Sequence, residues 1–379
     1  MSDNRNNQDL SFLDDLSEAQ KKAVIYCNSQ QLVLSSAGSG KTRILIYKIV
    51  YLIKKLKIPS NNILALTFTK KAANEMRERI SKLIGVESSK NICMGTFHSI
   101  FYNILKQNIS YLRHGNYNNN FQIINESEVK KMIKKILSKY FSNELNEIFQ
   151  KNNININNEA EKSSKLKKLI HVIIKKIMIL KNEGITYKKY KKMENEIKED
   201  KKKGMEFFKD VYKKYAKKCI RKNVMDFGDL IINTLDLFEN NQSILAEYQN
   251  KFKYILIDEF QDTNKTQYEI VKKLSNKSHN ICAVGDDYQS IYSFLGTDIN
   301  NIIIFKDCEG TKTDILSQNY RSNSTIVKVA NLLIKNNQNQ TEKNSFSEIK
   351  ETDGKVNILV IFNLVEKTEL LMNVKIYLK

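Results

Sequence analysis

The chain has 379 residues and a formal net charge of +20, with 62 Lys and Arg against 42 Asp and Glu. Hydrophobic residues make up 41% of it, enough for a packed core, so composition excludes a wholly disordered chain. No apolar run approaches the roughly 20 residues of a membrane span, and the polar start lacks the apolar core of a signal peptide. The excess positive charge favours an anionic partner, nucleic acid first, although a lysine-biased genome would produce the same composition.

Cysteine and histidine usage narrows the chemistry further. The five cysteines are far apart, contain no CxxC pair and therefore indicate neither a disulfide framework nor a zinc site. The four histidines are equally scattered. We expect an intracellular, reducing compartment: cytoplasm or nucleoid in a bacterium, nucleus or organelle in a eukaryote.

The first predicted strand, residues 31–34, runs into a glycine-rich turn and then into an amphipathic helical pattern. Strand, turn and helix in this order are the context of a phosphate-binding loop. Backbone N–H groups of such a loop bind phosphate, Lys41 reaches the β- and γ-phosphates, and the Thr42 hydroxyl binds Mg²⁺. Ser35 stands where the usual first glycine would be. The predicted nucleotide-binding residues are Ser36, Ala37, Gly38, Ser39, Gly40, Lys41 and Thr42.

Further apolar runs of strand length alternate with helical patterns along the chain. This alternation predicts an α/β fold, a parallel sheet with helices on both faces. The additional strands are expected at residues 62–67, 91–96, 254–257, 281–285 and 314–318.

Residues 107–222 interrupt this alternation with helical patterns alone, which predicts a helical insertion. Within it, residues 161–222 contain 22 Lys and Arg against 8 Asp and Glu, a net charge of +14. A solvated charged face accounts equally well for about half of these lysines. The asparagine-rich tract at 152–158 is typical of a surface loop.

The strand at 254–257 ends in two acids, Asp258 and Glu259. Open α/β sheets bind ligands at the carboxyl ends of their strands. We therefore expect Asp258 to hold Mg²⁺ through water and Glu259 to act as a general base on an attacking water. The alternative is an exposed acidic turn.

Residues 258–264, Asp-Glu-Phe-Gln-Asp-Thr-Asn, resemble motif II of the UvrD/Rep/PcrA family of superfamily 1 DNA helicases. Six further segments resemble motifs of that family, in its order: the Q motif at 16–20, the phosphate loop at 37–43, motif Ia at 67–73, motif Ib at 95–99, motif III at 285–292 and motif IV at 316–322. The resemblance implies a RecA-like P-loop NTPase fold with a helical insertion subdomain and the start of a second RecA-like domain. ATP and Mg²⁺ are the implied cofactors.

The resemblance also implies roles around the nucleotide. Gln20 would bind the adenine edge, Tyr320 would stack on adenine, and Arg43 would lie beside the nucleotide. Gln289 would sense the γ-phosphate, and Arg321 would reach it from the second motor domain. Outside such motifs, a tyrosine is more often a core residue and an arginine more often a surface residue.

On the DNA side, a motor that moves along single strands needs phosphate contacts and aromatic faces rather than sequence readout. The resemblance places these contacts in motifs Ia, Ib and III, at Thr67, Phe68, Thr96, His98, Tyr292 and Phe294. In the absence of this resemblance, each of these aromatic residues would more often be a core residue than a DNA contact, and His98 would more often have a structural role. The implied substrates are single-stranded DNA and single-strand/double-strand junctions. The family's motif III commonly reads GDDDQSIYGWRG or GDDDQSIYGFRG; here Leu295 replaces the arginine, which removes one charged contact.

Three regions follow from the motif order. The first motor domain is expected at 1–106 plus 223–300, the helical insertion at 107–222, and the start of the second motor domain at 301–379. A helix is predicted at residues 372–376. Neither motif V nor motif VI is found in the sequence, so we expect a fragment, a split gene product or a degenerate copy.

The function expected from these patterns is that of an ATP-dependent 3′→5′ DNA helicase or translocase in repair or replication. A non-catalytic ATP- and DNA-binding module is the alternative, and the 379-residue chain alone is expected to be weak or inactive. A recombination-nuclease subunit is disfavoured because no nuclease motif is present. Expected protein partners are a C-terminal helicase portion or DNA-repair proteins, with no membrane involved.

Overall fold

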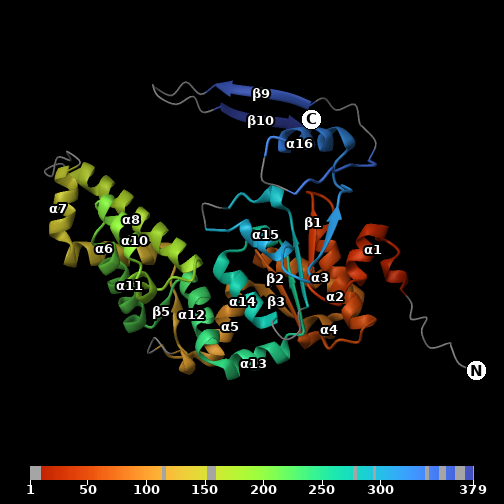
Figure 1. The fold of residues 1–379 in the computed structure, drawn as a ribbon, viewed down its shortest axis with the longest axis horizontal. Coiled ribbons are helices and arrows are strands. Elements are labelled where there is room, and N and C mark those ends of the chain that lie inside the picture. Colours follow the sequence, from red (N-terminus) through yellow and green to blue (C-terminus); the bar gives the residue numbers. More distant parts are fainter. Residues whose placement is uncertain are drawn as a thin grey trace, which may run out of the picture.

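The computed structural model describes residues 10–112, 117–151, 159–275, 280–292, 296–337, 341–349, 356–362 and 372–378. Figure 1 shows an α/β body, with a helical unit extending from one side and the last elements of the chain above the sheet. The asparagine-rich tract at 152–158 lies outside the described residues.

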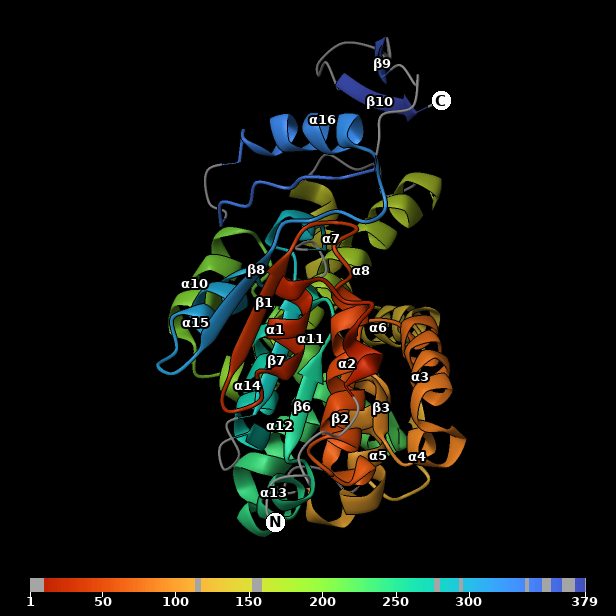
Figure 2. The ribbon, with the colours of Figure 1, turned by 90° about the vertical axis from the view of Figure 1, so that its right-hand side faces the viewer.

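Six parallel strands form the central sheet, in the order β3-β2-β6-β7-β1-β8. Figure 2 shows the strands across the sheet in this order. The predicted parallel α/β class is confirmed, and each predicted strand forms within two residues of its expected ends. The bounds are β1 Gln31–Ser35, β2 Ile63–Thr67, β3 Cys93–Thr96, β6 Tyr254–Ile257, β7 Ile281–Gly285 and β8 Lys312–Leu316.

Both faces of the sheet are buried, which explains why its strands are nearly continuous apolar runs. In β1, Leu32 and Leu34 face one core while Val33 faces the other. The core containing Val33 packs under α1 Glu18–Ile25, α2 Lys41–Lys54 and α3 Lys70–Ile84. The opposite core packs under α5 Phe97–Asn108, α12 Phe227–Asn240, α13 Gln242–Lys251, α14 Lys265–Ser275 and α15 Asn300–Lys306.

The helical insertion has a hydrophobic core of its own, in which Tyr190, Phe208, Tyr212 and Tyr215 are fully or almost fully buried. Its entry and exit segments meet in a parallel pair of two-residue strands, β4 Gln122–Ile123 and β5 Val224–Met225. The helices are α6 Glu126–Tyr140, α7 Ser142–Lys151, α8 Glu159–Asn182, α9 Tyr187–Tyr190, α10 Glu194–Lys202 and α11 Phe208–Lys222.

A buried ion-pair cluster joins this insertion to the body. Lys181 Nζ, at the end of α8, lies 2.6 Å from Asp226 Oδ2 and 2.7 Å from Asp229 Oδ1, at the start of α12. Tyr215 of α11 donates its hydroxyl to Asp226 at 2.6 Å. Burial alone would lower the pKa of Lys181, but the two carboxylates raise it well above its usual range. Burial and the neighbouring Asp226 carboxylate raise the pKa of Asp229 to about 6.

The structure differs from two expectations near the end of the chain. Strand β8 falls inside the range 301–379, yet it is hydrogen-bonded to β1, so the first sheet extends beyond the expected boundary at residue 300. The helix predicted at 372–376 is wrong: β10 Met372–Leu378 is a strand, antiparallel to β9 Val356–Phe362. Its apolar residues alternate with period two, which favours a strand.

The remaining elements are short or peripheral. They are α4 Val86–Lys90, α16 Ser324–Ile334 and the 3₁₀ turns Ser11–Leu13, Ser60–Asn62, Ile109–Tyr111, Phe260–Asp262 and Asp287–Gln289. Within the described ranges, no helix has both the length and the apolar character needed to cross a bilayer.

Candidate functional site: a nucleotide cavity and an aromatic pair

The predicted phosphate loop connects the end of β1 to the first turn of α2, as the sequence pattern indicates. Gly38 and Gly40 have φ of +75° and +89°, a region that residues with a Cβ rarely adopt. A Cβ on Gly38 would also lie 2.8 Å from Asn319 Nδ2 and 2.9 Å from Arg321 Cβ. The loop therefore requires glycine both for its backbone shape and for close approach of the motif IV segment.

A cavity of about 510 Å³ opens beside this loop. Its lining brings together residues from the phosphate loop and from motifs II, III and IV: Ala37, Gly38, Gly40, Lys41, Thr42, Arg43, Arg79, Glu259, Gln289, Tyr320 and Arg321. All of these except Arg79 are residues that the sequence predicted for the ATP site. Arg79 comes from the middle of α3, and no local pattern marks it in the sequence.

Three other predicted residues, Gln20, Ser36 and Ser39, make hydrogen bonds that stabilise the phosphate loop. Gln20 is 3% exposed and donates from Nε2 to the Ser39 carbonyl at 3.0 Å. The Ser39 hydroxyl donates to the Ser36 carbonyl at 2.7 Å, and the Ser36 hydroxyl contacts Ser345. In this arrangement the Gln20 side chain stabilises the conformation of the loop by binding the backbone carbonyl of Ser39.

Arg43 lies on the first turn of α2 and also lines the cavity. Its Nη2 donates to the Asp15 carbonyl at 2.9 Å, and its guanidinium lies 5.5 Å from the centre of the Tyr47 ring. These contacts hold the side chain beside the cavity.

The Asp258 carboxylate is buried behind the phosphate loop. Thr42 Oγ1 donates to its Oδ2 at 3.3 Å, and its buried Oδ1 has no hydrogen-bond partner among the described residues. Burial, and then the neighbouring Glu259, raise the pKa of Asp258 to about 6. Asp262 Oδ1 is likewise a buried carboxylate oxygen that has no hydrogen-bond partner among the described residues. An oxygen-preferring cation such as Mg²⁺ fits this hydroxyl and carboxylate pair, because it would supply the missing charge compensation.

Glu259 lines the cavity from a left-handed backbone conformation, φ +52° and ψ +53°. Strained non-glycine residues of this kind cluster at functional sites. Gln261 Nε2 donates to Glu259 Oε2 at 2.8 Å, while Gln261 Oε1 accepts from the Asp286 N–H at 2.9 Å. Gln261 thus links the motif II acid to motif III, a bridge that sequence analysis missed.

Asp286 is the meeting point of the two motifs. Gln289 Nε2 donates to Asp286 Oδ2 at 2.5 Å, and Lys41 Nζ lies 3.8 Å from the same oxygen. The carboxylate is therefore shared between the lysine of the phosphate loop and the predicted γ-phosphate sensor. Its position inside motif III was the only signal for it in the sequence.

The motif IV segment packs directly against the phosphate loop. Asn319 Nδ2 donates to the Ala37 carbonyl at 2.7 Å, and the Tyr320 N–H donates to the Gly38 carbonyl at 2.9 Å. The Tyr320 ring is half-exposed, and Arg321 lines the cavity. Asn319, which sequence analysis did not select, is the side chain that joins the two segments.

Lys343 is a further residue that sequence analysis missed. It is buried against motif III, with Nζ 2.7 Å from Asp286 Oδ1 and in contact with Asp287. Its backbone N–H donates at 3.0 Å to the hydroxyl of Tyr288, which stands where the family motif has aspartate. The hydrogen bond between Lys343 and Tyr288 joins residues that are 55 positions apart in the sequence, and no local sequence pattern predicts such a contact.

Two of the predicted DNA-binding residues meet in the structure. The Phe68 and Tyr292 rings, from motifs Ia and III, are stacked with centroids 5.3 Å apart and planes 24° apart. Phe68 is 42% exposed, so this aromatic pair is open to solvent. Phe294 and Leu295 lie outside the described residues.

The other predicted DNA contacts have local structural partners. Thr67 is fully buried and donates its hydroxyl to the Thr69 carbonyl at 3.0 Å. Thr96 caps α5, accepting from the Ser99 N–H at 3.2 Å. His98 packs edge-on against Phe227 at 5.4 Å, and burial lowers its pKa, so it is neutral at pH 7.

Comparisons with known proteins identify the family of the chain. The model of the UvrD/REP helicase N-terminal domain family matches residues 16–309. Similar proteins are the ATP-dependent DNA helicase Rep of Buchnera aphidicola subsp. Acyrthosiphon pisum, 39% identical over 88% of this chain and 47% of its own, and the ATP-dependent DNA helicase PcrA of Staphylococcus aureus strain Mu50, 38% identical over 88% of this chain and 42% of its own. The chain thus spans about half the length of these relatives. It belongs to the UvrD/REP helicase family, and it matches the N-terminal domain of that family.

Proposed function

We propose that this chain supplies the ATP-binding motor domain of a 3′→5′ DNA helicase or translocase acting in repair or replication. The network around Asp286 carries the proposal. That carboxylate contacts Lys41 of the phosphate loop and Gln289, and Gln289 precedes Tyr292 of the aromatic pair by three residues. Binding or loss of the γ-phosphate at Lys41 can therefore affect Tyr292, the predicted DNA contact, through the Asp286–Gln289 hydrogen bond and the three-residue segment that follows Gln289.

The residues of the cavity divide the chemistry among them. Lys41 binds and orients the β- and γ-phosphates, and Glu259 takes the proton of the attacking water. Arg321 stabilises the charge that spreads over the transferred phosphoryl group. Thr42 and Asp258 would hold Mg²⁺, which supplies charge neutralisation at the phosphates when bound.

The alternative is a module that binds ATP and DNA without hydrolysis. It is favoured by Leu295, which stands where the family's motif III commonly has arginine and so removes one charged contact. For the 379-residue chain taken alone we therefore expect slow hydrolysis and no strand separation.

The decisive experiment compares ATP hydrolysis by the purified chain with and without single-stranded oligo(dT), alongside Lys41→Ala. We expect weak turnover that DNA stimulates and that the variant abolishes. Nucleotide binding without any turnover would favour the non-catalytic module. Polarity is tested separately, by asking whether a fluorophore at the 5′ or the 3′ end of oligo(dT) reports arrival of the motor.

Removing the Phe68 ring is expected to weaken binding to single-stranded DNA by about 5- to 150-fold, because stacking contributes roughly 1–3 kcal/mol per base. Fluorescence anisotropy with labelled oligo(dT) measures the effect for Phe68→Ala. Tyr111→Ala is the matched control, since Tyr111 is 57% exposed but belongs to neither motif. If Phe68→Ala and the parent chain bind oligo(dT) with equal affinity, the aromatic pair does not contact single-stranded DNA.

The proposed setting is an intracellular, reducing compartment, because all five cysteines are free in the structure and three of them are buried. Protein partners of the motor would be a C-terminal helicase portion or DNA-repair proteins.

A further inference from the structure

Lys343 follows α16 in the chain, and its ammonium group is buried among the carboxylates of motif III. The residue is 3% exposed, and its Nζ lies 2.7 Å from Asp286 Oδ1 and contacts Asp287. The same nitrogen lies 4.0 Å from the centre of the Tyr288 ring. Burial of a cation costs free energy unless acids compensate its charge. Two acids and an aromatic ring do so here.

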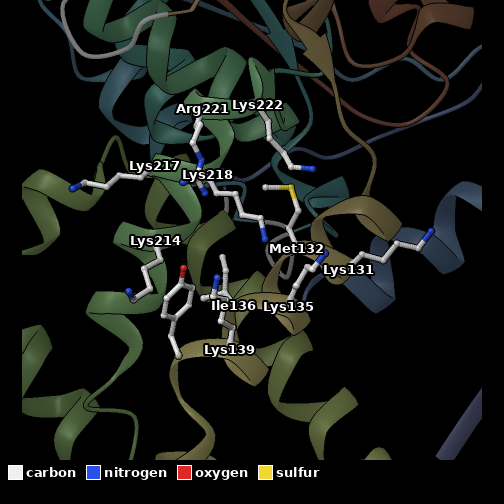
Figure 3. Close-up of a pocket in the computed structure, with 11 residues that line it drawn as sticks. Lys131, Met132, Lys135, Ile136, Lys139, Lys214, Lys217, Lys218, Arg221 and Lys222 are labelled. Carbon is white, nitrogen blue, oxygen red and sulfur yellow. The ribbon is translucent and has the colours of Figure 1, made fainter.

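The lysines of the helical insertion have a different setting. Those of α6 and α11 line a common groove of about 750 Å³ that has no acid among its lining residues (Figure 3). Lys131, Lys135 and Lys139 of that groove are exposed. An exposed lysine adds charge to a surface without fixing a neighbour, whereas Lys343 has two defined carboxylate partners. The effect of Lys343 is therefore expected at motif III.

Tyr288 fixes the backbone on both sides of residue 342. Its hydroxyl donates to the Thr341 carbonyl at 2.8 Å and accepts from the Lys343 N–H at 3.0 Å. Asp287 Oδ2 accepts from the Thr341 N–H at 2.7 Å. Aspartate, which the family's motif III commonly has at position 288, carries neither the ring nor the hydroxyl. In this chain, motif III itself thus positions the lysine that neutralises it.

The next residues of the same segment are bonded to motif IV and to the phosphate loop. The Phe346 N–H donates to the Ser317 carbonyl at 3.0 Å, and the Asn319 N–H donates to the Phe346 carbonyl at 2.7 Å. The Ser345 hydroxyl contacts that of Ser36. The segment that carries the lysine is therefore held at motif III on one side and at motif IV on the other.

Two lysines share the Asp286 carboxylate. Lys41 Nζ lies 3.8 Å from Oδ2, and Lys343 Nζ lies 2.7 Å from Oδ1. Among the described residues, these are the two cations within 4.0 Å of this group. The closer cation compensates most of the negative charge, so Asp286 attracts Lys41 less strongly than an unpaired carboxylate would. Lys41 is then available to the phosphates of a nucleotide.

We propose that Lys343 is a positioning residue for nucleotide binding, which neutralises Asp286 and thereby leaves Lys41 free to bind phosphate. This role rests on the proposed function, because it requires ATP in the cavity beside the phosphate loop. Lys343 is not among the residues that line this cavity, so it acts through Asp286. Without Lys343, the phosphates of ATP would compete with an unpaired carboxylate for Lys41.

The test measures equilibrium binding of a fluorescent ATP analogue, in the presence of Mg²⁺, to the full 379-residue chain. We expect Lys343→Met to weaken binding roughly 10- to 100-fold, the range for loss of one hydrogen bond to a charged group. Tyr288→Phe keeps the ring but loses both hydrogen bonds of the hydroxyl, and should weaken binding about 3- to 10-fold. Lys335→Met is the matched control at an exposed position after α16, and its affinity should stay within about twofold.

An Asp286→Asn background separates this role from a purely structural one. Asparagine cannot hold Lys41 as a carboxylate does, so adding Lys343→Met to this background should weaken binding less than about threefold. Equal losses in the two backgrounds would mean that Lys343 acts independently of Asp286 and would overturn the proposal. At saturating ATP, the single-turnover rate of Lys343→Met should stay within about threefold of the parent rate. A fall in rate at unchanged affinity would contradict the role as well.

Thermal unfolding establishes that each variant is folded at the temperature of the binding measurement. Should Lys343→Met fail to fold, the milder Tyr288→Phe decides: parent-like affinity would refute the role of the segment. Unchanged affinity of a folded Lys343→Met chain would refute it directly. A parent chain that binds no ATP would overturn the proposed function and this role with it. ATP binding without turnover would contradict the motor alone, because the binding comparison would still decide the role of Lys343.

Discussion

Replacing Glu259 by glutamine is expected to reduce the rate of ATP hydrolysis by about 10³-fold while leaving ATP affinity within a few-fold of the parent chain. Glutamine keeps the size of the side chain and can still accept the hydrogen bond from Gln261, which spans 2.8 Å in the parent. It cannot accept a proton from the attacking water. The loss should therefore appear in the chemical step, as a fall in kcat without a matching rise in KM.

Single-turnover hydrolysis of radiolabelled ATP, with a fluorescent ATP analogue to measure affinity, separates these two quantities. Glu247→Gln is the control, because Glu247 is an exposed glutamate on α13, remote from the cavity. A Glu259→Gln rate above one tenth of the parent rate would exclude Glu259 as the base. Equal loss of ATP affinity would instead indicate that the variant disturbs the cavity.

The Lys181→Met variant is expected to destabilise the chain by about 3–5 kcal/mol at pH 7. In the parent chain, Lys181 Nζ lies 2.6 Å from Asp226 Oδ2 and 2.7 Å from Asp229 Oδ1. Methionine fills a similar volume but leaves these two carboxylates buried together without their shared cation. Because this cluster joins α8 to α12, the insertion should unfold at a lower urea concentration than the body. Tyrosine fluorescence can follow unfolding, since the chain has 18 tyrosines and no tryptophan.

Acidification should restore part of that loss. The pKa of Asp229 is already raised to about 6 in the folded parent chain, above the 3.8 usual for an aspartate. A carboxyl with a raised folded pKa favours the folded state at low pH, and this contribution is lost as pH rises through that interval. Lys181 holds this pKa down in the parent, so its removal should raise the Asp229 pKa further, and lowering the pH from 7 to 5 should stabilise Lys181→Met more than the parent.

Lys175→Met is the matched control for this variant. Lys175 lies on the same helix but is exposed, so its replacement should change stability by less than about 0.5 kcal/mol. A loss for Lys181→Met no larger than for Lys175→Met would contradict a stabilising role for the buried cluster.

The amino-acid sequence by itself determined the α/β class and the positions of the six sheet strands, and it selected most of the residues that line the cavity beside the phosphate loop. These features leave local signals. A strand buried on both faces is a short apolar run, and a phosphate loop needs glycine at Gly38 and Gly40, where φ is positive. Ten of the eleven residues lining the cavity were predicted, because each lies in a motif whose chemistry is encoded by neighbouring residues.

Only the tertiary structure decided which distant segments meet. It placed β8 beside β1 in the first sheet, Asn319 on the Ala37 carbonyl and Lys343 on Asp286. It also turned the lysines of α6 and α11 toward a common groove, whereas composition could not tell them from a solvated face. Hydrogen bonds and ion pairs between residues tens or hundreds of positions apart leave no periodic pattern in the sequence, because their geometry exists only after the sheet and the insertion have folded.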